Sequence, residues 1–288
     1  MAWGVMQNGE TLYSTLTTRP FGDKFMKPNK LREKLSRGEP TLGTQIYSTW
    51  PAAVEALGHT GLYDYVEFVS EHGSFDLHDL DNLARTAELY DMGAMIKIDQ
   101  AHQAFLAQRS VGAGFDAVLF TDCRSADDVR ECIRNVRPDT PEDGGLYGSA
   151  IRRIAIPDHP GTAEYLQAIR DTVVAVMIEK KDAVDHLDEI LSVPGIDMIQ
   201  WGGVDYSINV GIPRQSSPNP EIQATRNRVF AAAIKAGIPP RAEIDTADEA
   251  KEFLDMGVRH FTVGADLHIL HNFWNDSGEQ LKELLSGI

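Results

Sequence analysis

Residues 173–205 read VVAVMIEKKDAVDHLDEILSVPGIDMIQWGGVD, and this stretch decides the fold. The apolar run at 173–178 stops at Glu179, and a second run at 196–201 leads through Gly-Gly-Val to Asp205. The segment between the two runs has the composition of a helix. Strand–helix–strand units of this kind build parallel sheets, whose chemistry collects at the carboxyl ends of the strands. The stretch therefore predicts a parallel α/β sheet with one carboxylate at each of two strand ends.

The same alternation runs through most of the chain. We expect strands at residues 42–48, 64–70, 94–98, 117–121, 173–178, 198–202, 240–244 and 260–263. Helical patterns occupy residues 52–57, 77–90, 101–111, 126–136, 183–191, 221–236 and 247–256, and an amphipathic helix starts near Pro28. No G-x-G-x-x-G fingerprint of a dinucleotide-binding sheet follows a strand. These features predict one (β/α)₈ TIM barrel over residues 31–288, preceded by an N-terminal arm at 1–30.

Local signals support these boundaries. Gly93, Gly237 and Gly257 each stand just before an expected strand, where a glycine with positive φ ends many helices. Thr246 is expected to cap the helix that follows it.

Composition excludes several classes of protein. The 288 residues are 42% hydrophobic and carry 27 basic against 43 acidic side chains, a net charge of −16. This charge argues against nucleic acid or an anionic membrane surface as a partner. No apolar stretch approaches the ~20 residues that a membrane helix needs. Cys123 and Cys132 are expected on one helix, too far apart to bridge, as reduced thiols of a cytoplasmic protein.

Residues 137–160 form a long segment rich in Gly, Pro and Asp after the fourth strand–helix unit. Segments this long are usually binding loops or lids, or are poorly ordered. We expect this one on or beside the catalytic side. The run at 144–149, followed by Arg152 and Arg153, could face an anionic ligand or form an exposed surface loop.

Several strand ends carry polar side chains. Glu179 and Asp205 are hard oxygen ligands of the kind that Mg²⁺ or Mn²⁺ prefers, although two solvated acids are the alternative. His72 lies just after the second strand, beside an acid, where it could transfer protons. Lys97 interrupts the third strand, and either pairs with Asp99, Glu67 or another carboxylate or forms a Schiff base. Arg241 and Glu243 share one face of the seventh strand, as an ion pair or as a clamp in which Arg241 binds a substrate carboxylate.

These residues resemble a known family. The matching phrases are residues 70–73 (SEHG), 178–179 (IE), 186–191 (HLDEIL), 194–197 (PGID), 202–207 (GGVDYS) and 263–266 (VGAD). They are similar to the class II pyruvate aldolases of the HpcH/HpaI (4-hydroxy-2-oxoheptane-1,7-dioate aldolase) family. The resemblance covers about residues 31 to 285. It implies a metal-dependent TIM barrel that acts on 2-oxo acids, typically a homohexamer whose last helix packs on a neighbouring subunit.

The resemblance also implies roles for individual residues. Glu179 and Asp205 would bind the divalent cation, Mg²⁺ or Mn²⁺. His72 would handle the proton of the substrate 4-hydroxyl through a metal-bound water. The backbone amides around Gly202, Gly203 and Val204 would hold the pyruvate carboxylate.

The chain departs from the family pattern at four positions. Lys97 stands where such aldolases carry an arginine that contacts the 2-oxo group. Gly112 replaces the aspartate that supports the catalytic histidine, Val69 replaces an acid, and Met177 replaces a glutamine near the metal. These changes indicate a divergent subfamily, or a mechanism in which Lys97, Arg241 or Glu243 takes a new role.

Four functions remain open from sequence alone. The first is a class II aldolase that cleaves a 4-hydroxy-2-oxo acid to pyruvate, or a related 2-oxo acid, and an aldehyde. The second keeps the metal enolate but acts as an acyl-CoA lyase or an oxo-acid decarboxylase. The others are a decayed oligomeric paralogue and a Schiff-base aldolase through Lys97. The first reading predicts a small-molecule substrate, no nucleic-acid or membrane partner, and a homo-oligomer.

Overall fold

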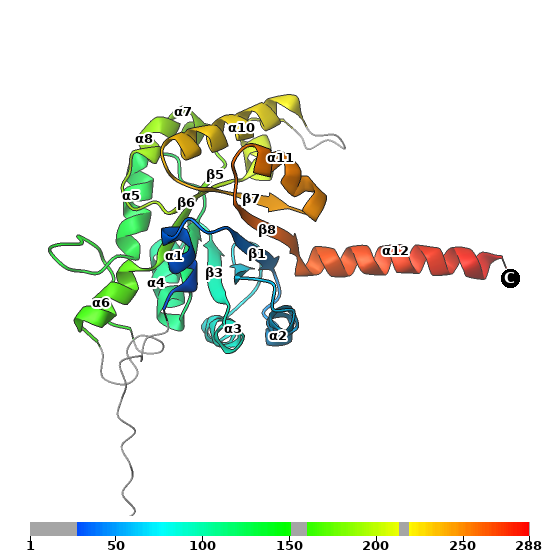
Figure 1. Ribbon diagram of the computed structural model, residues 1–288, viewed down its shortest axis with the longest axis horizontal. Coiled ribbons are helices and arrows are strands. Elements are labelled where there is room, and N and C mark those ends of the chain that lie inside the picture. Colours follow the sequence, from blue (N-terminus) through cyan, green and yellow to red (C-terminus); the bar gives the residue numbers. More distant parts are fainter. Residues whose placement is uncertain (1–27, 151–159, 213–218, 288) are drawn as a thin grey trace, which may run out of the picture.

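The computed structural model describes residues 28–150, 160–212 and 219–287, and its strands close into a barrel (Figure 1). All neighbouring strands are parallel, and β8 pairs back to β1. The strands are β1 (Thr41–Ile46), β2 (Tyr65–Val69), β3 (Gly93–Ile98), β4 (Ala117–Phe120), β5 (Val173–Ile178), β6 (Met198–Trp201), β7 (Pro240–Ile244) and β8 (His260–Ala265). The predicted (β/α)₈ barrel is confirmed, and the strand limits differ from the expected ones by a few residues.

Helices surround this barrel. They are α1 (Lys30–Ser36), α2 (Pro51–His59), α3 (Leu77–Leu89), α4 (Gln103–Ala113), α5 (Ala126–Asn135), α6 (Ala163–Arg170), α7 (Lys181–Asp185), α8 (Leu187–Leu191), α9 (Gly203–Asn209), α10 (Pro220–Lys235), η1 (Ala247–Glu249), α11 (Ala250–Asp255) and α12 (Asp266–Ser286). The helix expected at 183–191 is two helices, α7 and α8, because the backbone of His186 leaves the helical region at φ −104° and ψ 25°. Periodicity did not reveal α6, α9 or α12.

Strand β5 shows why the apolar runs become barrel strands. All six of its residues are buried, because both of its faces are covered. Val174, Val176 and Ile178 pack with the surrounding helices, whereas Val173, Ala175 and Met177 belong to a separate cluster inside the barrel. Buried parallel strands read as continuous apolar runs for this reason.

Helix α1 closes the amino end of the barrel. Leu31 packs into the interior cluster. The side-chain amide of Asn29 donates to the backbone oxygen of Asp116, just before β4, at 2.7 Å. Arg32 forms an ion pair with Asp197, just before β6. With this end plugged, the carboxyl end is where the barrel can admit a ligand.

The segment after α5 lies at this closed end, which corrects the expectation that it faces the catalytic side. Arg137 donates to the backbone oxygen of Thr172, immediately before β5, at 2.9 Å. Asp143 accepts two hydrogen bonds of 2.8 Å from Arg170 of α6. The reason is topological, because a segment that follows a barrel helix returns to the amino ends of the strands. Arg152 and Arg153 lie outside the described residues, as do residues 1–27 of the expected arm.

The local expectations for helix ends hold in part. Gly237 and Gly257 have the expected positive φ, but Gly93 does not; it begins β3, and Asp91 takes the left-handed conformation at φ 61°. Aspartate tolerates that conformation better than most residues. Thr246 caps η1 as expected, although its side chain makes no capping hydrogen bond.

The two cysteines are closer together than expected. Helix α5 begins only at Ala126, so Cys123 lies in the loop before it and Cys132 lies on the helix. Their sulfur atoms are 3.6 Å apart, and both are buried free thiols. The expectation that both lie on one helix, too far apart to bridge, is therefore wrong about their placement and separation, while the thiols are unbridged, as expected of reduced cysteines.

Helix α12 extends away from the barrel as a long arm (Figure 1). It has 21 residues, and none of those described in it is buried. Within the described ranges, no helix combines the length and the apolar character needed to span a membrane.

Candidate active site

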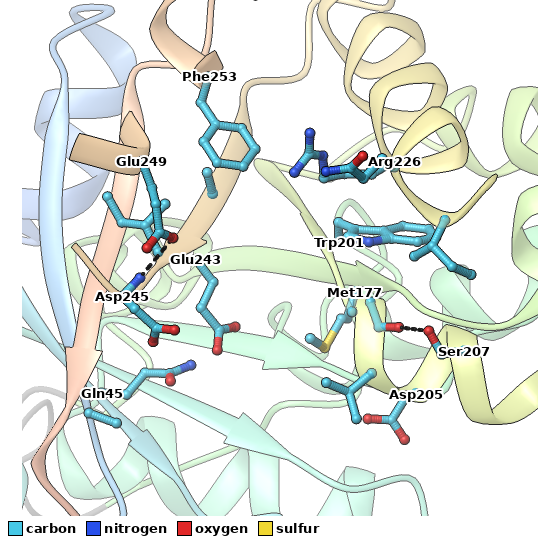
Figure 2. Close-up of a pocket in the computed structure, with 18 of the residues that line it drawn as sticks. Gln45, Met177, Trp201, Asp205, Ser207, Arg226, Glu243, Asp245, Glu249 and Phe253 are labelled. Carbon is cyan, nitrogen blue, oxygen red and sulfur yellow. Dashed lines mark hydrogen bonds between the residues drawn. The ribbon is translucent and has the colours of Figure 1, made fainter. Parts of the chain in front are cut away.

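A cavity of about 700 Å³ opens among the carboxyl ends of the strands (Figure 2). Its wall includes most of the residues that the sequence singled out, namely His72, Lys97, Met177, Gly202, Gly203, Val204, Asp205 and Glu243. The closed barrel thus gathers side chains from β2, β3, β6, β7 and their loops at one place. A cavity of this volume accommodates a small organic ligand.

Glu179 immediately follows β5 and is fully buried. Its Oε1 accepts a 2.7 Å hydrogen bond from the backbone N–H of Asp122. Its Oε2 has no hydrogen-bond partner among the described residues. Burial raises the pKa of Glu179 to about 7, against the opposing effect of the Asp122 N–H. A buried carboxylate oxygen without a hydrogen-bond partner has the chemistry of a cation ligand.

Gly202 allows this carboxylate to sit against the start of α9. A Cβ atom at Gly202 would lie 2.6 Å from the Cβ of Glu179 and 2.7 Å from its Oε2. Only glycine permits so close an approach. The backbone amides of Gly203 and Val204 lie in the first turn of α9, where N–H groups have no partner within the helix. The sequence expectation of an anion-holding backbone is compatible with this placement for Gly203 and Val204, but not for Gly202, whose N–H already donates to the backbone oxygen of Ile178 at 3.0 Å.

Asp205 lies in the same first turn, with its side chain 35% exposed. The ammonium of Lys180 stands 3.6 Å from its Oδ1 and 2.7 Å from Oδ1 of Asp122. Burial acts against the charge of Lys180, but the hydrogen bond to Asp122 and the nearby carboxylates of Glu179, Asp122 and Asp205 together outweigh it, and the pKa of Lys180 is raised. Lys180 is therefore a cation held between two carboxylates beside Glu179.

Lys97, Glu71 and His72 form a compact group on the other side of the barrel mouth. The Lys97 Nζ is 2.7 Å from Oε2 of Glu71 and 3.4 Å from Nε2 of His72. Glu71 Oε2 is in turn 3.5 Å from that histidine nitrogen. The Lys97 side chain is only 7% exposed, whereas that of His72 is 45% exposed. The carboxylate that satisfies Lys97 is thus Glu71, rather than Asp99 or Glu67.

The charge of Lys97 follows from this ion pair. Burial acts to lower the pKa of Lys97, but Glu71 outweighs it, so the pKa is raised above the ordinary value. A Schiff-base lysine needs the opposite shift, because only the free amine attacks a carbonyl. The geometry therefore favours a fixed ammonium over an imine-forming lysine.

Arg241 is placed deeper than expected and has a different partner. Its Nη2 forms an ion pair with Glu67, and its Nε donates to Gln200 at 2.7 Å. Its side chain is 1% exposed. Glu243 instead accepts a 3.2 Å hydrogen bond from the Gln200 amide and faces the cavity. The expected Arg241–Glu243 pair is wrong because, across the closed barrel, the guanidinium reaches Glu67 of β2.

The positions that depart from the family pattern are accounted for in part. Val69 is buried at the end of β2, and Met177 lies between the barrel interior and the cavity wall. A Cβ atom at Gly112 would lie 3.3 Å from the hydroxyl of Tyr147, on the side where α4 packs against the loop at the amino end. An acid at that position would not stand beside His72 of the same chain. Glu71 is the acid that does.

The donor set suits a hard divalent cation. Glu179 offers a buried oxygen that has no hydrogen-bond partner among the described residues, and Asp205 offers a second carboxylate in the first turn of α9, the helix that Gly202 caps. Among the described residues no group of three or more His, Cys, Asp or Glu side chains is arranged to hold a metal. Two carboxylates suffice where a substrate and water supply the remaining oxygens.

Comparison with known proteins agrees with this geometry. The profile of the HpcH/HpaI aldolase/citrate lyase family matches residues 45–272. The chain belongs to this family. A hydroxypyruvate/pyruvate aldolase from Paraburkholderia phytofirmans is 25% identical over 83% of this chain and 92% of its own length. A 2-keto-3-deoxy-L-rhamnonate aldolase from Escherichia coli is 28% identical over 83% of this chain and 87% of its own.

A solved structure supports the same assignment. An HpcH/HpaI aldolase/citrate lyase family protein from Burkholderia cenocepacia J2315 superposes with a TM-score of 0.79 and 26% identity, over 88% of this chain and all of the other. The resemblance read from the sequence is confirmed, and the family and its aldolase relatives support a carbon–carbon lyase.

Within this aldolase-like site, sequence reasoning did not assign Glu71, Asp122 or Lys180. Each of these three residues is either adjacent in the sequence to an assigned residue or lies at the end of a neighbouring strand. The signal was present, because Asp122 follows β4 and Lys180 follows Glu179, at the same barrel edge. What the sequence lacked was the distance between them.

Proposed function

We propose that the protein is a divalent-cation-dependent aldolase that cleaves a 4-hydroxy-2-oxo acid to pyruvate, or a related 2-oxo acid, and an aldehyde. The observation that carries this proposal is the buried carboxylate of Glu179, which packs against Gly202 at the start of α9, the helix whose first turn holds Asp205. One of the four carboxylate oxygens is buried without a hydrogen-bond partner among the described residues. A buried charge without a partner is unfavourable, and a cation of the Mg²⁺ or Mn²⁺ type is the natural compensation.

A cation held by these two acids would polarise the 2-oxo group and stabilise the negative charge that develops on its oxygen. The chain's own residues supply the rest of the chemistry. His72 accepts the proton of the 4-hydroxyl as the C3–C4 bond breaks and the aldehyde forms. Lys97, fixed by Glu71, contributes a positive charge at the barrel mouth for the developing oxyanion. The amides of Gly203 and Val204, in the first turn of α9, orient the substrate carboxylate.

A pyruvate-release assay over a panel of 4-hydroxy-2-oxo acids tests the proposal. Pyruvate should appear with Mg²⁺ or Mn²⁺, disappear with a chelator, and return when the metal is restored. Borohydride in the presence of pyruvate should leave Lys97 unmodified. Metal-dependent decarboxylation of oxaloacetate or cleavage of an acyl-CoA, with no pyruvate from any aldol, would replace this function with the related lyase.

We further propose that the protein is a cytoplasmic homo-oligomer, a hexamer by resemblance to the family. Helix α12 supports assembly, because it exposes eight large apolar side chains: Leu267, Ile269, Leu270, Phe273, Trp274, Leu281, Leu284 and Leu285. An apolar surface of this extent usually marks a protein interface. The double substitution Phe273→Glu with Trp274→Glu should reduce the mass measured by light scattering. An unchanged mass would remove α12 from the interface.

A further inference from the structure

The cavity does not end at the barrel mouth. It continues outward between α10 and α11, past Trp201 and toward Arg226 and Phe253 (Figure 2). At about 700 Å³ it has the volume of a pocket for a drug-sized ligand, well above the need of a three-carbon 2-oxo acid. The outer half is therefore available to the part of a substrate that becomes the aldehyde.

The lysine and arginine side chains on the described cavity wall are already committed. Lys97 is paired with Glu71 at 2.7 Å. Arg226 forms an ion pair with Glu252, its Nε donates to Asn227 at 3.0 Å, and its guanidinium lies over the ring of Phe253 at 4.7 Å. Neither cation is free to form the bidentate pair by which proteins usually hold a carboxylate or a phosphate.

The opposite wall of the cavity carries acids. Glu243 at β7 and Asp245 and Glu249 beyond it line one side, across from Trp201 and Arg226 (Figure 2). Arg241, the cation on the same strand face as Glu243, is bound to Glu67 deeper in the barrel. The carboxyl of Glu243 accepts a 3.2 Å hydrogen bond from the side-chain amide of Gln200. Arg241 and Lys97 act on this carboxyl from a distance, but among the described residues neither forms an ion pair with it, so it presents hydrogen-bonding capacity and negative charge to a ligand.

We infer that Glu243 is a specificity-determining residue that selects an uncharged, hydroxylated aldehyde half and rejects an anionic one. The inference rests on the proposed aldolase function. A hydroxyl group can donate to the carboxylate and can also accept from the protonated acid, so it complements Glu243 in either state. A carboxylate or phosphate placed there meets like charge and, among the residues that the structure describes on the cavity wall, no free guanidinium, and both effects disfavour binding.

Condensation with pyruvate measures this selectivity directly. The acceptors are D-glyceraldehyde, glyceraldehyde 3-phosphate and succinic semialdehyde, each assayed with Mg²⁺ and with Mn²⁺. Glyceraldehyde should be preferred by at least about 100-fold in kcat/KM over both anions, with most of the difference in KM. A preference for either anionic acceptor overturns the inference.

Substitutions then assign the preference to one residue. Glu243→Gln keeps the size and the hydrogen bonding of the side chain. It should reduce the ratio of kcat/KM for glyceraldehyde to kcat/KM for either anionic acceptor at least tenfold. Glu243→Leu should raise KM for glyceraldehyde at least tenfold, because an apolar side chain cannot satisfy the hydroxyl. The matched control is Asp248→Asn. Asp248 is an exposed acid of η1 that lies outside the cavity wall, so its substitution should change neither the ratio of the kcat/KM values nor the KM for glyceraldehyde. An unchanged ratio in Glu243→Gln also overturns the inference.

A separate readout distinguishes failure of the inference from failure of the proposed function. Exchange of the C3 protons of pyruvate in D₂O needs the cation site but no aldehyde. Metal-dependent exchange together with a preference for anionic acceptors would keep the aldolase function and reject the role of Glu243. Absence of both exchange and condensation in the wild-type protein would reject the aldolase function, and the inference with it.

Discussion

Replacing Glu179 with glutamine should stabilise the metal-free protein while removing the proposed cation site. Ionised Glu179 is fully buried, and burial raises its pKa from 4.5 to about 7. At about 1.4 kcal/mol per pH unit, the carboxylate then lowers the folding stability by about 3 kcal/mol at pH 8. The folded state holds the proton to higher pH than the unfolded state, so this loss develops as pH rises from about 4.5 and is complete above about 7. Glutamine does not titrate, so the Glu179→Gln protein does not undergo this loss of stability.

Thermal unfolding in EDTA at pH 5 and pH 8 measures the effect. Glu179→Gln should melt roughly 5 °C above the wild type at pH 8, and the two should nearly coincide at pH 5. Asp205→Asn is the matched control. Its side chain is 35% exposed, so its melting temperature should change little at either pH, although cation binding is lost. A Glu179→Gln protein that melts below the wild type at pH 8, or a difference that does not depend on pH, would refute the reasoning.

Three further substitutions test the remaining groups. His72→Ala should retain the cation but lose turnover by a factor on the order of 10²–10⁴, and a loss of stability alone would make His72 structural. Lys97→Met is best made together with Glu71→Gln, because the single substitution leaves the largely buried carboxylate of Glu71 unpaired. Turnover of the double variant should fall strongly at every pH. Lys97→Arg should retain part of the wild-type turnover. Lys180→Met should tighten Mn²⁺ binding at least about tenfold, since a cation 3.6 Å from Asp205 competes with the metal. Lys181→Met, whose partner is Asp185 on the surface, should leave that affinity unchanged.

The sequence by itself determined the barrel and the pair of acids. Both depend on periodicity along the chain, which the sequence displays directly. A buried parallel strand needs apolar residues on both faces, so runs such as 173–178 cannot be exposed elements. Neighbouring parallel strands end at the same edge, and the pairing of Ile178 with Trp201 brings Glu179 and the start of α9 together without further information.

Only the tertiary structure decided which polar side chains meet. Alternation predicts that Glu67, Lys97 and Arg241 point into the barrel, but it does not say which carboxylate each cation reaches. Glu67 and Arg241 are 174 positions apart and come together because the sheet closes. Closure, strand stagger and rotamer together set distances of a few ångströms, and hydrogen bonds and ion pairs form or fail at that scale. For the same reason the sequence did not predict the contact between Cys123 and Cys132, or the position of Lys180 between Asp122 and Asp205. Periodicity predicts which face of an element a side chain occupies, but not which residue it meets on the neighbouring element.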